Sequence, residues 1–199
     1  MTNPNHSAQA GIGVRAPERS KVKFKYMTLS FKTKINGKPT YFVEKIWAGL
    51  EGHCIDPFDF EARRTGKYEF KDNIDRNPKI HTIREDRKNR WKEGKNIDFF
   101  INSRTENMFR FAPKIAVIST QELKINWFSD KRDLAPCKAG GIYNYVEVII
   151  DGNRLEIKDV EQLATNDGFD TIEDFFDFFN QSFKGKIIHW TKFKYYGNN

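Results

Sequence analysis

The chain has 199 residues, of which 38% are hydrophobic and 31% are charged, and it carries a formal net charge of +7 at pH 7. These proportions are typical of a globular domain and exclude an intrinsically disordered chain. No apolar run approaches the roughly 20 residues that span a bilayer, and the N-terminal residues lack the apolar segment of a secretory signal. Since there are only two cysteines, the composition indicates a cytoplasmic protein with no membrane partner.

The sequence shows no pattern for a metal or a cofactor. Cys54 and Cys137 belong to no C-x-x-C pair and the four histidines are scattered, so we predict no metal site. Neither a G-x-G-x-x-G motif nor a P-loop is present, so we predict no cofactor. The chain is also rich in aromatic residues, with eighteen Phe, seven Tyr and four Trp. Because aromatic rings and cations together suit base stacking and phosphate contacts, we expect RNA, DNA or a modified nucleoside as the partner.

The first half of the chain predicts a strand followed by a helix. Residues 1–20 are polar and indicate a disordered tail, whereas residues 21–34 alternate between apolar and polar as in a half-buried strand. Thr40 is placed to cap a helix, whose apolar stripe contains Phe42, Val43, Ile46 and Leu50. Residues 52–77 have no clear period, and we expect an insertion there with one short strand at 68–70.

The second half predicts several short strands and two helices. Thr171 begins a pattern similar to a capping box, and the apolar residues that follow it have helical spacing. A shorter helix is predicted at 160–164, after a hairpin turn at Asp151 and Gly152. The predicted strands cover residues 82–84, 97–101, 109–117, 123–128, 143–150, 154–157 and 186–190.

Together these elements predict one α+β domain over residues 21–196. Five to seven short strands with two or three flanking helices are expected to form a small, partly open β-barrel. The insertion at 52–77 lies between the first helix and the rest of this domain.

The segment from Lys79 to Arg84 carries the clearest chemical pattern. If residues 82–84 form a strand, Thr82 and Arg84 share one face and Ile83 points to the core. Lys79 follows a proline, so the preceding loop can direct its amine to the same face. A hydroxyl beside a lysine whose pKa is lowered by a second cation can act as a nucleophile, and the same three groups can also bind an anion.

The residues after Arg84 extend this pattern with further cations. Arg87, Lys88 and Arg90 follow Arg84 closely, and together the four predict a phosphate-binding surface. Trp91 is included as a candidate ligand contact, although a tryptophan in such a position is more often part of the core.

The order of these motifs resembles the ASCH family of the PUA-like superfold. The motifs are FVEKIWAGL, then KIHTIR, then RWKEGKNIDFF, then a Phe-rich helix and FKGKIIHW. In that family a short helix leads into a K-x-x-T-x-R strand, a W-x-x-G turn follows, and a helix and a strand end the domain. The resemblance covers residues 33–194 and implies a PUA-like barrel, a fold that generally binds nucleic acids.

The resemblance also implies roles for three residues. A small bacterial member of the family is an amidohydrolase that removes the acetyl group from acetylcytidine. Its motif lysine, motif threonine and a downstream glutamate correspond here to Lys79 as proton acceptor, Thr82 as nucleophile and Asp167 as proton donor. The acid departs from the family pattern, because aspartate is one methylene shorter than glutamate.

Three functions therefore remain open from the sequence. The first is a binding module for RNA, DNA or a modified base. The second is an amidohydrolase that deacylates a modified cytidine. The third is an interaction protein, such as a phage-type inhibitor or a nucleotide sequestrant. An intact lysine, threonine and acid favour the enzyme, whereas the insertion and the shorter acid favour binding alone.

Overall fold

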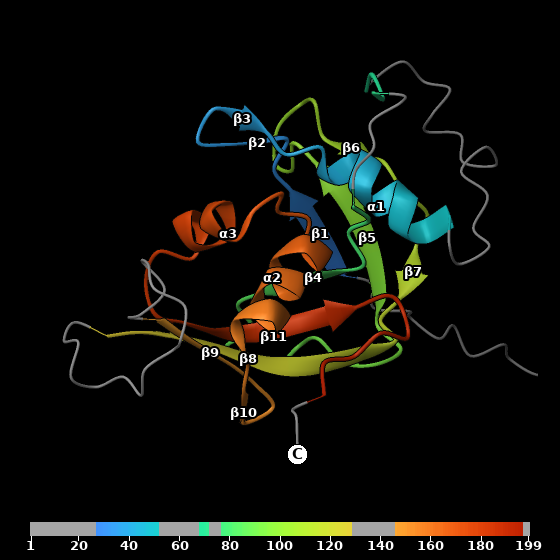
Figure 1. The fold of residues 1–199 in the computed structure, drawn as a ribbon. Coiled ribbons are helices and arrows are strands. Elements are labelled where there is room, and N and C mark those ends of the chain that lie inside the picture. The colour runs from blue at the N-terminus through green and yellow to red at the C-terminus, as the bar shows by residue number, and fades with distance from the viewer. Residues whose placement is uncertain (1–26, 52–67, 72–76, 129–145, 197–199) are drawn as a thin grey trace, which may run out of the picture.

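The larger of the two main sheets forms the base of the fold (Figure 1). The computed structural model describes residues 27–51, 68–71, 77–128 and 146–196, so the predicted tail and most of the insertion lie outside the described residues. The larger sheet is antiparallel throughout. Its strands follow the order β10 (Asn153–Arg154), β9 (Val146–Ile150), β8 (Ser119–Trp127), β11 (Phe183–His189) and β4 (His81–Arg84).

The smaller sheet stands against the larger one and is mixed. Its first strand, β1 (Met27–Phe31), runs parallel to β5 (Asn96–Ile101). Two short strands, β6 (Phe109–Arg110) and β7 (Ile115–Ala116), pair with β5 in the antiparallel direction. A separate hairpin joins β2 (Lys34–Ile35) to β3 (Lys38–Pro39), and its turn residues have the positive φ angles that such tight turns require.

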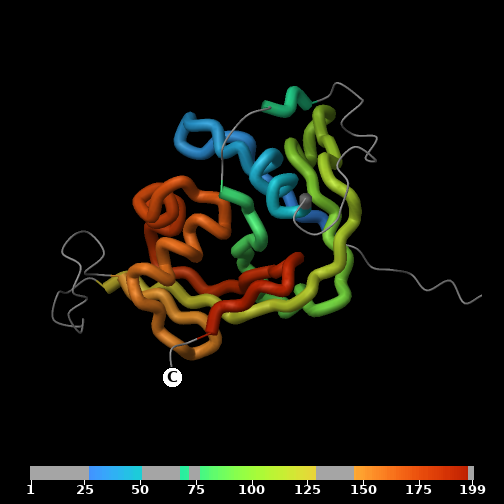
Figure 2. Tube along the Cα trace, turned by 45° about the vertical axis from the view of Figure 1, so that its right-hand side comes forward, coloured from blue at the N-terminus to red at the C-terminus, as the bar shows by residue number. Residues whose placement is uncertain are grey.

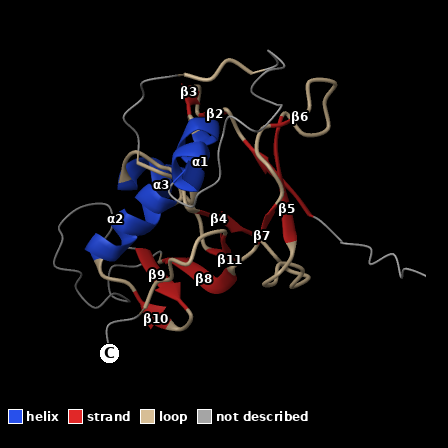
Figure 3. Cartoon of the chain, turned by 90° about the vertical axis from the view of Figure 1, so that its right-hand side faces the viewer, coloured by secondary structure: helices blue, strands red, loops and turns tan. Residues whose placement is uncertain are grey.

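Three helices gather on one side of the molecule, with the larger sheet below them and the smaller sheet beside them (Figure 3). They are α1 (Phe42–Glu51), α2 (Ile157–Asn166) and α3 (Ile172–Phe178). The predicted stripe of α1 is confirmed, since all four of its apolar residues are buried. Thr171 caps α3 as predicted and accepts a hydrogen bond from the backbone N–H of Asp174 at 3.1 Å.

The structure confirms an α+β domain and corrects several elements. Eleven strands are described rather than five to seven, because five of the eleven are only two residues long. The predicted strand at 109–117 is two short strands, and no strand forms at 68–70. The helix predicted at 160–164 begins at Ile157, so the return strand of the hairpin is shorter than expected.

The predicted barrel does not close within the described residues. The chain does pass directly from the smaller to the larger sheet: the N–H of Val117 donates to Lys95 O and that of Ile118 to His189 O, each at 2.8 Å. On the opposite side, however, β1 pairs only with β5 and β4 only with β11 among these strands. The side chain of Arg84 connects the two edges instead, donating to the carbonyl oxygen of Ser30 at 2.9 Å.

Strand β4 runs through the middle of the molecule (Figure 2). Helix α1 fixes the chain segment that enters this strand. The N–H of Lys79 donates to the carbonyl oxygen of Lys45 at 2.9 Å. Gly49 faces the same segment, and a Cβ atom there would lie only 2.5 Å from the carbonyl oxygen of Lys79. A glycine at this position therefore lets the helix approach the backbone closely.

Candidate functional site

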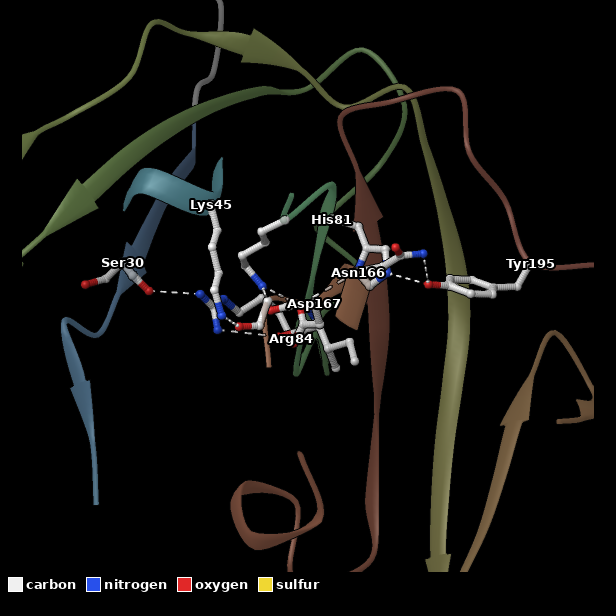
Figure 4. A network of polar contacts seen from close by, with 10 residues as sticks. Ser30, Lys45, His81, Arg84, Asn166, Asp167 and Tyr195 are labelled. Atoms are coloured by element: carbon white, nitrogen blue, oxygen red, sulfur yellow. Dashed lines mark hydrogen bonds and ion pairs between the residues drawn. The ribbon is translucent and has the colours of Figure 1, made fainter. Parts of the chain in front are cut away.

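Asp167 lies at the centre of a network of polar side chains (Figure 4), and it forms a buried ion pair with Lys79. Lys79 is 1% exposed and Asp167 is 5% exposed. The Nζ atom of Lys79 lies 2.6 Å from Oδ1 of Asp167 and also donates to the carbonyl oxygen of that residue. Asp167 is the residue at the C-terminal cap of α2, so the pair ties this helix to the segment before β4.

The carboxylate of Asp167 has further partners on β4. Its Oδ1 atom accepts the backbone N–H of Ile83 at 3.2 Å and lies 3.7 Å from Nδ1 of His81. Burial alone raises the pKa of this carboxyl group, but the ammonium of Lys79 and the ring of His81 hold it below its ordinary value. Asp167 is therefore ionised at neutral pH.

Lys79 experiences opposing influences on its charge. Burial lowers its pKa, Asp167 raises it, and the result is a pKa of about 8. The ring of Phe42 lies 4.8 Å from the ammonium and favours the charged form through a cation–π contact. At pH 7 the lysine is thus mostly protonated and paired, which is the form that cannot accept a proton.

The structure brings Lys79, Arg84 and Asp167 together, and of these three only Arg84 is partly exposed. The guanidinium of Arg84 and the ammonium of Lys79 lie over the same ring of Phe31, at 5.1 and 6.0 Å. Thr82 is only 1% exposed, and its hydroxyl bonds neither Lys79 nor Asp167 in the described part of the chain. The sequence placed Lys79, Thr82 and Arg84 on one face that was expected to be a ligand-accessible cleft. This expectation is wrong for Lys79 and Thr82, because both side chains are buried.

Two parts of this polar network were missed in the sequence. Lys45 is 1% exposed and donates to Gly168 O at 2.6 Å and to Asp170 at 2.7 Å. Its spacing of three residues from Phe42 places it on the buried face of α1, and this was the available signal. Tyr195 was missed because it comes from the far end of the chain, where its hydroxyl bonds Nε2 of His81 at 2.8 Å.

His189 lies beside this network without entering it. Its ring stands 5.3 Å from the ring of His81, and both of its ring nitrogens are buried without a hydrogen-bond partner among the described residues. Burial lowers the pKa of His189 to about 3. The residue is therefore neutral in the folded protein near neutral pH.

The remaining candidate residues form a basic loop, which we define as residues 85–92. Arg87, Lys88 and Arg90 are exposed on it. Trp91 is 3% exposed and belongs to the core, so it anchors the loop and offers no ring face to a ligand. The prediction of Trp91 as a ligand contact is corrected for this reason.

No family model, curated protein or solved structure matches this chain. The resemblance to the ASCH family therefore stays a prediction. Within the described ranges, no three histidine, cysteine, aspartate or glutamate side chains gather as they do around a metal ion. None of the three described helices has the length and hydrophobicity of a membrane-spanning helix.

The first prediction concerns the energetics of the buried ion pair. We expect Lys79→Met or Asp167→Asn to lower the free energy of unfolding by about 3–5 kcal/mol, because each leaves one charge buried without its partner. The double variant should lose less than the sum, by about 1–3 kcal/mol. Urea denaturation of the four proteins measures this coupling.

A control for these variants is Lys38→Met, which removes an exposed ion pair to Asp174. It should change the free energy of unfolding by no more than about 1 kcal/mol. Strict additivity of Lys79→Met and Asp167→Asn would contradict the role that we give to the pair.

The second prediction concerns pH. The pKa of His189 is about 3 when folded, against 6.5 ordinarily, so only the unfolded chain binds this proton between those values. Stability is therefore lost as pH falls below about 6.5, by up to about 1.4 kcal/mol per pH unit. We expect His189→Phe to reduce that slope in denaturation measured from pH 7 to pH 4. An unchanged slope in the variant would show that other groups cause the acid sensitivity.

Proposed function

We propose that this domain binds a nucleic acid or a modified nucleoside and that the basic loop contacts phosphate. One observation carries the proposal: exposed cations lie on a loop whose backbone is already fixed. The two carboxylate oxygens of Asp86 accept the N–H groups of Arg90 and Trp91, each at 2.8 Å. Lys186 supports the loop from β11, donating to Asn89 and to the carbonyl oxygen of Trp91. A loop held in this way loses little entropy on binding.

The distribution of charge favours the basic loop as the phosphate-binding surface over a hollow elsewhere on the surface. That hollow has a volume of about 200 Å³ and lies between the β2–β3 hairpin, α1 and α3. Three carboxylates line it, from Asp170, Asp174 and Asp177, against the single ammonium of Lys38. A polyanion is repelled by such a surface, so phosphate contacts belong to the basic loop.

We also propose that the fold is an open form of the PUA-like barrel that the ASCH resemblance implies. The direct passage of the chain from β7 into β8 supports a common origin of the two sheets in one barrel wall. The bridge from Arg84 to Ser30 lies where the last ladder of a closed barrel is expected. A nucleic-acid-binding domain of this kind also fits the cytoplasmic location that the composition suggests.

Amidohydrolase activity is the second candidate. The contact between Lys79 and Asp167 and the lysine pKa of about 8 favour it, since a lysine of this kind can lose its proton near neutral pH. The buried hydroxyl of Thr82 and the ionised state of Asp167 argue against it. We therefore place binding first and the hydrolase second.

The third prediction tests phosphate binding by its salt dependence. For a wild-type complex with RNA or DNA, we expect log affinity to fall with log salt by several units. Replacing Arg87, Lys88 and Arg90 with alanine should reduce that slope by about 2 on a single strand, because each lost phosphate contact contributes about 0.7. Fluorescence anisotropy over a salt series measures both slopes.

The matched control replaces three exposed lysines outside the loop, Lys158, Lys192 and Lys194, with alanine. Its slope should stay closer to that of the wild type than the slope of the loop variant does. An affinity that salt does not change would point instead to a small neutral ligand, as a sequestrant of nucleosides would bind.

The fourth prediction tests hydrolysis. We expect wild-type protein to leave acetylcytidine intact at pH 7, because Lys79 is protonated and paired there. Chromatography of the nucleoside after incubation measures this directly. Turnover that rises through pH 8, falls by roughly a hundredfold or more in Thr82→Val and survives in Thr82→Ser would establish the amidohydrolase instead.

A further inference from the structure

We infer that the nucleic acid bound by this domain is single-stranded and that Phe178 stacks on one of its bases. This inference rests on the proposed function and adds the ligand class and a second contact surface. Its basis is a hollow of about 380 Å³ beside the basic loop. The hollow is lined by Glu85 and Arg87 of the loop, by the aromatic residues Phe178, Phe179 and Phe183, and by Gln181 and Ser182. Arg87 belongs to both the hollow and the loop, so the two surfaces are continuous.

Phe178 is the exposed ring of this hollow. It is the last residue of α3 and is 36% exposed, whereas Phe175 and Phe176 of the same helix are buried. The buried side of the ring is fixed by Phe169 and Phe179, with ring centroids at 5.6 and 4.9 Å. A ring held in place from behind can accept a base without losing conformational entropy of its own.

A cation already occupies a position over this ring. The Nζ atom of Lys32 lies 5.6 Å from the ring centroid of Phe178, and Lys32 is itself exposed. A lysine side chain in water moves easily, so a base can replace it over the ring while the ammonium turns to a neighbouring phosphate. Lys32 thus places positive charge over the exposed ring, and Arg87, which is paired with Glu85 at 2.6 Å, adds a second cation to the lining of the hollow.

An exposed ring that stacks on a base favours single strands, because a duplex hides the faces of its bases. In a double helix each base is stacked on both faces, so a protein ring cannot reach it without unstacking. In a single strand the base faces are open, and aromatic platforms with nearby cations bind them with little sequence preference. An exposed phenylalanine with Lys32 over its ring and residues of the basic loop in the same hollow matches this pattern.

The experiment compares Phe178→Ala with the wild type on an oligoadenylate RNA of roughly ten nucleotides and on the matching duplex. We expect the alanine variant to bind the single strand roughly tenfold more weakly, the loss typical of one stacked base. The salt slope should not change, because no phosphate contact is removed. The duplex should bind both proteins more weakly than the wild type binds the single strand.

Two further variants keep the test decisive. Phe178→Trp should retain binding, and its added fluorescence should be quenched by the single strand, which reports stacking directly. Tyr196→Ala removes an aromatic residue that is 81% exposed outside the hollow and should bind as the wild type does.

The outcomes separate the inference from the proposed function. If Phe178→Ala binds the single strand as tightly as the wild type while the loop variant binds weakly, the stacking contact is overturned and the proposed function stands. Equal binding of duplex and single strand by the wild type overturns the ligand class. If the wild type binds neither nucleic acid, the proposed function fails first and the inference falls with it.

Discussion

The buried ion pair between Lys79 and Asp167 is the interaction on which the arrangement of the domain depends. Two charges are removed from water there, and only close geometry with additional hydrogen bonds offsets that cost. The structure supplies both, because the ammonium also reaches the backbone of Asp167 and the carboxylate also accepts the N–H of Ile83. The pair thereby holds the end of α2 against the start of β4. Through the ring of Phe42, it also holds helix α1 in place. Loss of either charge leaves the other without compensation at the meeting point of these elements.

Local elements could be predicted from the sequence to the extent that local periodicity determines them. The stripe of α1 and the cap of α3 depend on residues a few positions apart, and both are present in the structure. The strand at 109–117 was predicted as one piece because its pattern cannot show that the chain bends between β6 and β7. The closure of the sheets also depends on partners far apart in the chain. The sequence predicted a partly open barrel, whereas the described part of the structure joins β4 to β1 only through the side chain of Arg84.

In the candidate site, too, local patterns could be predicted from the sequence and long-range contacts could not. The prediction that Lys79 and Asp167 lie close together rested on the resemblance to the order of motifs in the ASCH family. No local pattern connects residues that are 88 positions apart. The burial of both residues and of Thr82 was missed, because strand alternation gives the face on which a side chain lies but not what covers that face. Lys45 was passed over since a lysine within an apolar helix normally extends its amine to water. Here that amine instead donates a hydrogen bond to the carbonyl oxygen of Gly168.

Among the described residues, two groups of cations therefore have different physical roles. Lys45, Lys79 and Arg84 bind carbonyl oxygens, two carboxylates and aromatic rings, and these contacts join helices and sheets. The cations of the basic loop remain at the surface on a backbone that Asp86 and Trp91 hold in place. A ligand that met the motif lysine would first have to separate it from Asp167, whereas a phosphate reaches the loop without disturbing the fold. For this reason the K-x-x-T-x-R motif here organises the domain, and the residues that follow it are the ones available for binding.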